Sequence, residues 1–442
     1  MDRRRFIRRA TAGAATLAAA PAAFGSDSRL PVASFDDSAL DLAPRIRDWR
    51  HENPEASATD EDFWAEIRRA FTIDTNQINL NSGSVSPAPR IVQEAERNAL
   101  TIQNMSPSLW VDEYLLPQRE MLRTRLATLF GCDREELAIT RNTTESLEIA
   151  QFGLPLMSGD EVLTTTQDYP SMLTAYRQRA RRDGITLKMV PFPSPASSPD
   201  EIYDAMERAI GPRTKVLHFS HVTYTAGQIF PVQRLCRLAR ERGLYSVIDG
   251  AHAFAHFPFD GAELGCDVFG ASLHKWLTAP FGNGLLYVRK GLIETIWPLT
   301  AAPESLDGDI RKFEQIGTAP VANRNAIGEA ITFHEAIGAE RKAARLRFLR
   351  ERWMRQVADV PGVHLLTPDD PIQACALGTM RIDGIGAAEL TDRLQREDKI
   401  HVRPRFVPNE WEGIRVTPNV FSTTWEVDTF AAAITRIATS LR

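Results

Sequence analysis

Residues 269–277, with the sequence FGASLHKWL, contain the most informative residue of the chain, Lys275. A lysine inside such an apolar stretch is rare unless it has a partner. A second apolar run, residues 246–248, lies upstream and closes with Asp249. The pattern predicts a buried strand that ends in an acid, followed by a lysine with a specific chemical task.

An acid at the end of a buried strand and a lysine after it are the two groups that a pyridoxal 5'-phosphate (PLP) site requires. The cofactor needs a carboxylate beside its pyridine nitrogen and an amine that reacts with its aldehyde. Asp249 and Lys275 are the candidates for these two roles. The sequence therefore leads to the hypothesis of a PLP site.

The composition is that of a soluble globular protein of two or three domains, with 442 residues, 43% of them hydrophobic and 25% charged. The net charge of -5 gives no sign of the excess positive charge that nucleic-acid-binding proteins have, so we expect no nucleic-acid partner. The four cysteines lack metal-ligand spacing, which argues against a zinc site or a disulfide framework. Beyond the N-terminal leader no apolar run approaches the length of a membrane span, so we expect no stable membrane insertion of the mature protein.

Residues 1–25 have the pattern of a secretory signal, with clustered arginines, an alanine-rich apolar run and small residues. The run RRRFIR at residues 3–8 resembles the twin-arginine pattern, although Asp2 stands where serine or threonine is usual. Cleavage is expected between Ala20 and Gly25. The twin-arginine export machinery carries folded proteins, often with a cofactor inserted, so we expect a periplasmic or extracellular enzyme loaded in the cytoplasm. A basic amphipathic helix on the mature protein is the alternative.

Strand and helix patterns alternate between residues 137 and 288. Such alternation predicts an α/β fold with a largely parallel sheet between two layers of helices. Ligands of these sheets bind beyond the carboxyl ends of the strands, where we expect the site residues. We predict strands at residues 137–140, 161–166, 187–192, 215–219, 245–248, 268–271 and 284–288, and helices at residues 171–182, 202–210 and 232–242.

The pattern changes after residue 298, which indicates a second, smaller domain. We predict a large domain at residues 76–312, a small α+β domain at residues 313–442, and a segment at residues 26–75 that packs with the small domain. In the small domain we expect long helices within residues 323–360, helices at residues 387–396 and 425–441, and strands at residues 378–382, 401–403 and 414–416.

Three shorter stretches allow more than one interpretation. Asn142 has the spacing of a helix cap with Glu145, and the two threonines between them could bind phosphate at the positive end of the helix dipole. An ordinary cap is the alternative. Residues 78–84 form a Gly/Ser turn that could approach a ligand or serve only as a loop. Trp110 and Tyr114 could cover a pocket, but core filling is favoured.

The combination of these motifs resembles the class V aminotransferase family of fold-type I PLP-dependent enzymes. The resemblance rests on residues 249–252 (DGAH), on residues 272–275 (SLHK) and on the Asn-Thr-Thr helix start at residues 142–144. It covers residues 76–442 and is strongest for the branch that holds isopenicillin N epimerase. It implies a mostly parallel seven-stranded sheet between helices, a smaller α+β domain and a homodimer.

The resemblance also assigns roles to single residues. Lys275 would bind the cofactor's aldehyde and, once displaced by the substrate, move the α-proton as a base. Asp249 would keep the pyridine nitrogen protonated, and Tyr169 would stack on the ring. The other implied cofactor contacts are His221 near the phenolic oxygen, His252 where glutamine is common, Asn142, Thr143, Thr144, Ser272 and His274 around the phosphate, and Thr318 from the neighbouring subunit.

Arginines are implied at the substrate. Arg415 matches the arginine that grips the α-carboxylate of an amino-acid substrate, for which a planar guanidinium is suited. Arg403 and Arg405 either bind a second acidic group or belong to a solvated rim. Residues 402–411 contain no cysteine, and Cys375 lies too far upstream, so a cysteine desulfurase is disfavoured.

We therefore expect an exported PLP-dependent enzyme that acts on an amino acid or amine, with transamination as the leading reaction. Epimerisation of the isopenicillin N type is the first alternative, because it begins with removal of the same proton. A maturation enzyme for a peptide or siderophore side chain is the next. A binding module without turnover is disfavoured, because both the lysine and the aspartate are present.

Overall fold

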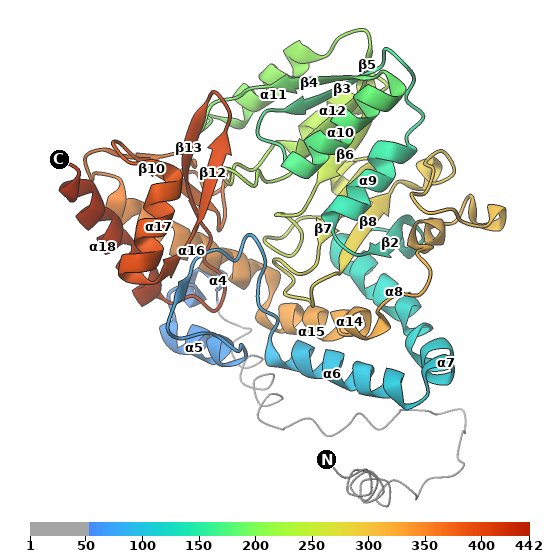
Figure 1. Cartoon of the computed structure of the whole chain (residues 1–442), viewed down its shortest axis with the longest axis horizontal. Helices are drawn as coiled ribbons and strands as arrows, with labels where there is room; N and C mark the ends of the chain where they lie inside the picture. Colours follow the sequence, from blue (N-terminus) through green and yellow to red (C-terminus); the bar gives the residue numbers. More distant parts are fainter. Residues whose placement is uncertain (1–52) are drawn as a thin grey trace, which may run out of the picture. The chain divides into compact units, whose positions relative to one another are not determined.

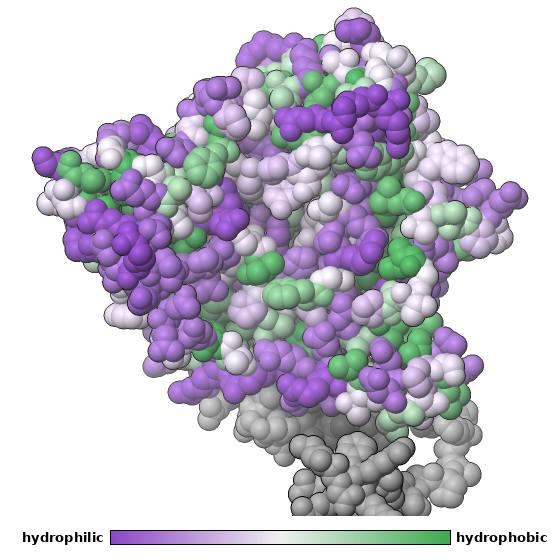
Figure 2. Space-filling model, viewed as in Figure 1, coloured by the Kyte–Doolittle hydropathy of each residue, from purple (hydrophilic) through white to green (hydrophobic). Residues whose placement is uncertain are grey.

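A seven-stranded sheet with helices on both faces organises most of the chain (Figure 1). The computed structural model describes residues 53–442. The predicted signal sequence, residues 1–25, and residues 26–52 of the N-terminal segment lie outside the described residues. Figure 2 shows mainly polar side chains on the face of the described part that it presents, with apolar patches scattered between them.

The large sheet confirms the predicted fold class. Strand β8 runs antiparallel to its neighbours β2 and β7, and the other neighbouring strands run parallel. The carboxyl ends of the parallel strands therefore lie at one edge. In spatial order the strands are β2 (Leu137–Thr140), β8 (Gly284–Val288), β7 (Val268–Ser272), β6 (Tyr245–Asp249), β5 (Thr214–Ser220), β3 (Glu161–Thr165) and β4 (Thr186–Val190).

Successive side chains along these strands enter two different apolar cores, as the period of two in a strand requires. Ile248 and Phe269 belong to one core with helices α8, α11 and α12. Val247 and Val268 belong to the other core with α9 and α10. These helices span α8 (Gln118–Phe130), α9 (Thr143–Gly153), α10 (Pro170–Asp183), α11 (Pro199–Ala209) and α12 (Val232–Glu241), and the short α13 (Gly261–Leu264) precedes β7.

A four-stranded antiparallel sheet forms the centre of the C-terminal part. It has its own apolar core with helices α16, α17 and α18. The described residues nevertheless belong to one compact unit, so the domain boundary at residues 312 and 313 stays a prediction. The elements are α16 (Ala339–Val357), β9 (Val363–Leu365), β10 (Gly378–Ile382), α17 (Ala387–Asp398), β11 (Ile400–His401), β12 (Arg403–Val407), β13 (Trp411–Val416) and α18 (Thr424–Ser440).

The described start of the chain packs near this smaller sheet. Strand β1 (Ile78–Asn79) pairs in parallel with β11. Helix α5 (Glu61–Arg69) places Phe63 and Trp64 in an apolar cluster with Phe421. Short α4 (Pro54–Ser57) contacts α16, and α6 (Arg90–Met105), α14 (Val321–Asn325) and α15 (Ile327–Ile337) run side by side below the large sheet in Figure 1.

The structure differs from the sequence interpretation at several places. The strand predicted at residues 401–403 is two strands, β11 and β12, which belong to different sheets. Residues 106–114 showed no periodicity, yet Pro107–Trp110 is an α-helix and Val111–Leu115 a π-helix. Tyr114 meets Trp110 edge to face, and both are half-buried. A π-helix breaks the 3.6-residue period, which explains why the pattern was missed. The three-residue strand β9 was also not predicted.

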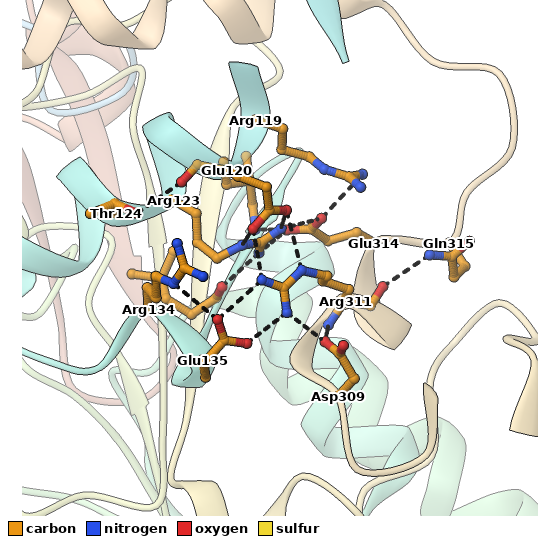
Figure 3. Close-up of polar contacts among 12 residues, drawn as sticks. Arg119, Glu120, Arg123, Thr124, Arg134, Glu135, Asp309, Arg311, Glu314 and Gln315 are labelled. Atoms are coloured by element: carbon orange, nitrogen blue, oxygen red, sulfur yellow. Dashed lines mark hydrogen bonds and ion pairs between the residues drawn. The ribbon is translucent and has the colours of Figure 1, made fainter. Parts of the chain in front are cut away.

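A buried carboxylate, Glu314, fastens the chain to the outer strand β2 (Figure 3). It accepts hydrogen bonds from the Arg123 guanidinium, at 2.5 and 3.0 Å, and from the backbone N–H of Ile139 at 2.6 Å. Arg119 adds an ion pair at 3.2 Å. Since β2 leads directly into the start of α9, this contact supports one wall of the site described below.

Neither a metal site nor a membrane span is evident in the described part of the chain. Within residues 53–442 no cluster of histidine, cysteine and acidic side chains has the arrangement of metal ligands. No helix in that range combines the length and the apolar character needed to cross a bilayer.

Glu314→Ala is expected to lower the free energy of unfolding by about 3–5 kcal/mol, because it leaves Arg123 buried without its main partner. Glu135, whose side chain is 37% exposed in the same network, is the matched control. Glu135→Ala should cost about 1 kcal/mol or less. Urea unfolding of the purified variants measures both values, and equal losses would contradict the role of the buried pair.

Candidate active site

A cavity of about 770 Å³ opens at the carboxyl edge of the large sheet, between that edge and the β12–β13 hairpin. The walls come from loops that are far apart in the sequence. Lining residues that the argument uses are Asn142, Thr143, Thr144, Tyr169, Tyr224, Asp249, His252, Ser272, His274, Lys275, Arg403, Arg405 and Arg415.

The backbone around Lys275 is held from several sides. Leu273 N–H donates to the Asn283 carbonyl at 2.9 Å. Trp276 is fully buried and stacks on His256 with ring centroids 3.8 Å apart. The Lys342 ammonium donates to the Trp276 carbonyl. These contacts fix the strand end and the turn from which the Lys275 side chain enters the cavity.

Opposing effects set the charge of Lys275. Burial lowers the pKa of Lys275 to about 8, while Asp249 raises it and Arg415 lowers it further. Burial raises the pKa of Asp249 to about 6, against the opposite influence of Lys275. The lysine therefore has a sizeable neutral fraction near neutral pH, and the aspartate remains mostly ionised.

The part of the cavity lining at the start of helix α9 is suited to an anion. Thr143 N–H donates to Ser272 Oγ at 2.9 Å, and the two hydroxyl groups lie 2.7 Å apart. Asn142 caps helix α9 by accepting from the Glu145 N–H at 2.9 Å. The Glu145 carboxylate does not complete a capping box, because it binds the Arg141 N–H and guanidinium instead.

Close packing places this helix start against the sheet. A side chain at Gly270 would come within 2.9 Å of Ser146, so only glycine lets α9 approach β7 this closely. The Thr144 N–H and hydroxyl have no acceptor among the described residues. A phosphate at this position would meet free donors and the positive end of an 11-residue helix.

Two histidines, His252 and His274, also line the cavity. His252 Nε2 lies 3.4 Å from Lys275 Nζ, while the buried Nδ1 of His252 and that of His274 have no partner among the described residues. Burial and Lys275 lower the pKa of His274 to about 4, and burial lowers that of His252. Unpaired donors, a carboxylate, an amine and an anion pocket in one cavity fit PLP.

Tyr169 lines the cavity as predicted, positioned by its neighbour Asp168. The Asp168 carboxylate accepts from the backbone of Thr165 at 2.9 Å and from Ser220 Oγ at 2.8 Å, which joins the ends of β3 and β5. Tyr169 follows at the start of α10 and meets Tyr224 edge to face, with ring centroids 5.2 Å apart. Its ring is partly exposed, which suits a stacking role.

His221 is placed differently from the prediction. Its ring does not line the cavity; it packs against Phe257, Phe259 and Phe269, and burial lowers its pKa to about 3. The preceding Ser220 does line the cavity. Because side chains alternate along an extended chain, His221 must face the other side, so the expected contact with the cofactor is corrected.

Thr318 does not line the cavity of its own chain. It is exposed and lies beside α6 and α14, near Leu100 and Asn323. Its expected contact with the phosphate group of a neighbouring subunit stays a prediction.

Arg415 is almost fully buried, at 1% exposure, yet no carboxylate among the described residues pairs with it. It donates to the Tyr224 carbonyl at 2.9 Å, to Ser84 Oγ at 3.1 Å and to Asn81 Oδ1 at 3.3 Å. A side chain at Gly83 would come within 2.9 Å of Thr417 Cγ2 and 3.2 Å of the guanidinium carbon, so glycine lets the turn at residues 78–84 lie this close to Arg415.

The sequence analysis missed three residues of the site: Tyr224, Asn81 and Ser84. Tyr224 lines the cavity, and its carbonyl holds both Arg405 and Arg415. The Gly/Ser turn had been noted, but nothing in its pattern pointed to an arginine more than 300 positions away. No local signal marks Tyr224 either, apart from its place shortly after a predicted strand.

His221→Leu is expected to retain PLP and to reduce the sensitivity of the protein to acid. The folded protein keeps His221 neutral down to a pKa of about 3, whereas the unfolded chain takes up a proton below about 6.5. Stability is therefore complete above pH 6.5 and falls as the pH decreases, by up to about 1.4 kcal/mol per pH unit for this group.

Urea unfolding at about pH 7.5 and about pH 5 should show a stability loss on acidification that is about 2 kcal/mol smaller for His221→Leu than for the unchanged protein. PLP absorbance should be alike in both proteins. If His221→Leu lost PLP, the His221 ring would contact the cofactor after all, as the sequence analysis predicted.

Comparison with known proteins agrees with this geometry. The model of the family "Aminotransferase class-V" matches residues 79–404. Isopenicillin N epimerase of Streptomyces clavuligerus is 32% identical over 398 residues, which is 84% of this chain and 97% of the relative. The epimerase of Amycolatopsis lactamdurans is 30% identical over 85% and 98%.

Among solved structures, the apo cysteine desulfurase from Thermococcus onnurineus superposes with a TM-score of 0.74 at 21% identity, over 85% of this chain and 98% of that one. The likeness establishes the fold-type I architecture. The family match over residues 79–404 and the 32% identity to the Streptomyces clavuligerus epimerase show that the chain belongs to the aminotransferase class-V family of PLP-dependent enzymes.

Proposed function

We propose that the protein is an aminotransferase that acts on an α-amino acid. The observation that carries this proposal is Arg415, a buried guanidinium without a carboxylate partner among residues 53–442, in the same cavity as Lys275 and Asp249. A buried cation is costly unless an anion meets it. The α-carboxylate of the substrate supplies that anion and brings the α-carbon to the lysine.

Each residue then has a defined task. PLP, when bound, acts as the electron sink that makes the α-proton acidic. Asp249, ionised above a pKa of about 6, holds the proton on the pyridine nitrogen. Lys275, with a pKa of about 8, is neutral in enough molecules to accept the α-proton and protonated in enough to return it. Arg415 keeps the α-carbon within reach by its hold on the carboxylate.

Transamination is favoured because it requires only one base. Lys275 would be the one base that takes the proton from the α-carbon and returns it during transamination, with PLP supplying the electron sink. Tyr169 and Tyr224 are the lining residues that could supply a second proton donor, and their rings pack edge to face against each other.

Epimerisation is the second candidate. It is favoured by the likeness to two isopenicillin N epimerases over nearly their whole length. The reaction needs a base on one face of the α-carbon and a proton donor on the other face. Lys275 serves one face, and a hydroxyl of the Tyr169–Tyr224 pair is the candidate donor for the other.

The decisive measurement follows the holoenzyme during addition of an amino acid, with and without a 2-oxo acid. Transamination should convert the bound cofactor to its amine form and transfer the amino group to the oxo acid. Epimerisation should instead exchange the α-proton with deuterated solvent and invert the centre, without transfer. If inversion without transfer were the only outcome, the aminotransferase proposal would be replaced by the epimerase.

Lys275→Ala should abolish either reaction and remove the absorbance of the lysine-bound cofactor. Arg415→Gln should retain the cofactor and raise KM about tenfold to a hundredfold, since a charge-assisted contact to the carboxylate is lost. Arg381→Gln is the control, because Arg381 is a partly exposed arginine paired with Asp383 outside the cavity. An unchanged KM in Arg415→Gln would refute the carboxylate role.

We further propose that the protein is exported folded by the twin-arginine route, on the basis of residues 3–8. In a bacterium with a functional pathway, replacing Arg3 and Arg4 together by lysine should retain the protein in the cytoplasm. Fractionation, the PLP content of each fraction and the N-terminal mass of the product test this. Equal export of the variant and the unchanged protein would contradict the route.

A further inference from the structure

We propose that the substrate carries a second acidic group, bound by Arg405 and Arg403 at the mouth of the cavity. The substrate class is an α-amino acid with a carboxylate on its side chain. This inference rests on the proposed function, because it assumes that Arg415 takes the α-carboxylate.

Three guanidinium groups lie on one face of the β12–β13 hairpin. Arg403 and Arg405 are two positions apart on β12, and Arg403 is the register partner of Arg415 on β13. Residues two apart on a strand, and residues directly opposite on neighbouring strands, point to the same side of the sheet. All three line the cavity. Like charges directly opposite each other destabilise a hairpin unless an anion lies between them.

Two of these cations share a single acceptor. Arg405 Nε donates to the Tyr224 carbonyl at 3.3 Å, and Arg415 donates to the same oxygen at 2.9 Å. The Arg405 guanidinium also lies over the Tyr224 ring, 5.3 Å from its centroid. Burial and the neighbouring Arg403 lower the pKa of Arg405 to about 10, which remains high enough to keep it charged.

No acid within residues 53–442 forms an ion pair with Arg403, Arg405 or Arg415. By contrast, the buried Arg123 has the Glu314 carboxylate at 2.5 Å. Four cationic side chains line the cavity, namely these three arginines and Lys275. Asp249 is the one acid among the lining residues. This imbalance predicts that ligands bring the missing negative charge.

PLP and one carboxylate do not use all of these cations. The phosphate end of the cavity is at Thr143 and Ser272, on the large sheet, whereas the arginines belong to the hairpin. A single α-carboxylate is enough to pair with the planar guanidinium of Arg415. Arg405 and Arg403 then remain for a second acidic group, farther along the substrate.

The wall between these positions suits a short carbon chain. Tyr224 and Val85 are among the lining residues, and Val85 is 46% exposed. Such side chains can pack against the methylene groups of a substrate. The neighbouring cations would bind the acidic groups at its two ends. The volume of about 770 Å³ leaves room for such a chain next to the cofactor.

The test compares ligands that differ only in the second acid. Glutarate and valerate have equal carbon chains, neither carries an amino group, and calorimetry with the holoenzyme measures the binding of each. Glutarate should bind at least about tenfold more tightly. In steady-state assays, glutamate and 2-aminoadipate should likewise have a lower KM than glutamine and norleucine, and their ranking gives the position of the second acid.

Arg405→Gln and Arg403→Gln should each reduce the ratio of glutarate to valerate affinity, with the larger effect at the half-buried Arg405. Arg381→Gln should leave the ratio unchanged, as should Arg396→Gln, another exposed arginine outside the cavity. Equal affinity for glutarate and valerate, or a ratio unaffected by both cavity variants, would overturn the inference.

The two proposals can fail separately. Selective glutarate binding without any amino transfer or proton exchange would refute the proposed function and support the second acid site. Amino-acid turnover without preference for a second acid would support the function and refute the site.

Discussion

The balance between burial and the charge of Asp249 at Lys275 is the interaction on which the rest of the site depends. Burial alone would suppress the ammonium form, and a close carboxylate alone would make it permanent. Together they bring the pKa to about 8, where the same group can accept and donate a proton. The sheet creates this balance, because β6 and β7 are neighbours and end at the same edge.

The residues around that edge are held by contacts that carry no chemistry of their own. Asp168 joins β3 to β5 and thereby presents Tyr169. Glu314 fastens β2, which leads into the anion-binding start of α9. The stacking of His256 on Trp276 supports the residue next to Lys275. The carboxylates of Asp168 and Glu314 are thus paired within the fold, whereas the buried Arg415 of the cavity has no carboxylate partner among the described residues.

Much of this could be predicted from the sequence, because the relevant rules are local. Alternating strands and helices predicted the parallel sheet, and the ends of its strands contained Thr143, Tyr169, Asp249 and Lys275. The prediction for His221 was wrong because the face of a strand depends on the register, and one position reverses it. The partners of Arg415 at residues 81 and 84 are products of tertiary folding, which no local pattern encodes.

The charged groups of the site are divided between the two sheets. The carboxylate of Asp249 and the amine of Lys275 come from the large sheet, whereas the three arginines come from the hairpin of the smaller one. A ligand with its reacting carbon at the lysine and its acids at the arginines therefore bridges the two sheets. Its binding offsets the repulsion between guanidinium groups that share one carbonyl oxygen. In the proposed function, the free energy gained at the arginines would position the carbon at the lysine, so that specificity and catalysis would draw on the same contacts.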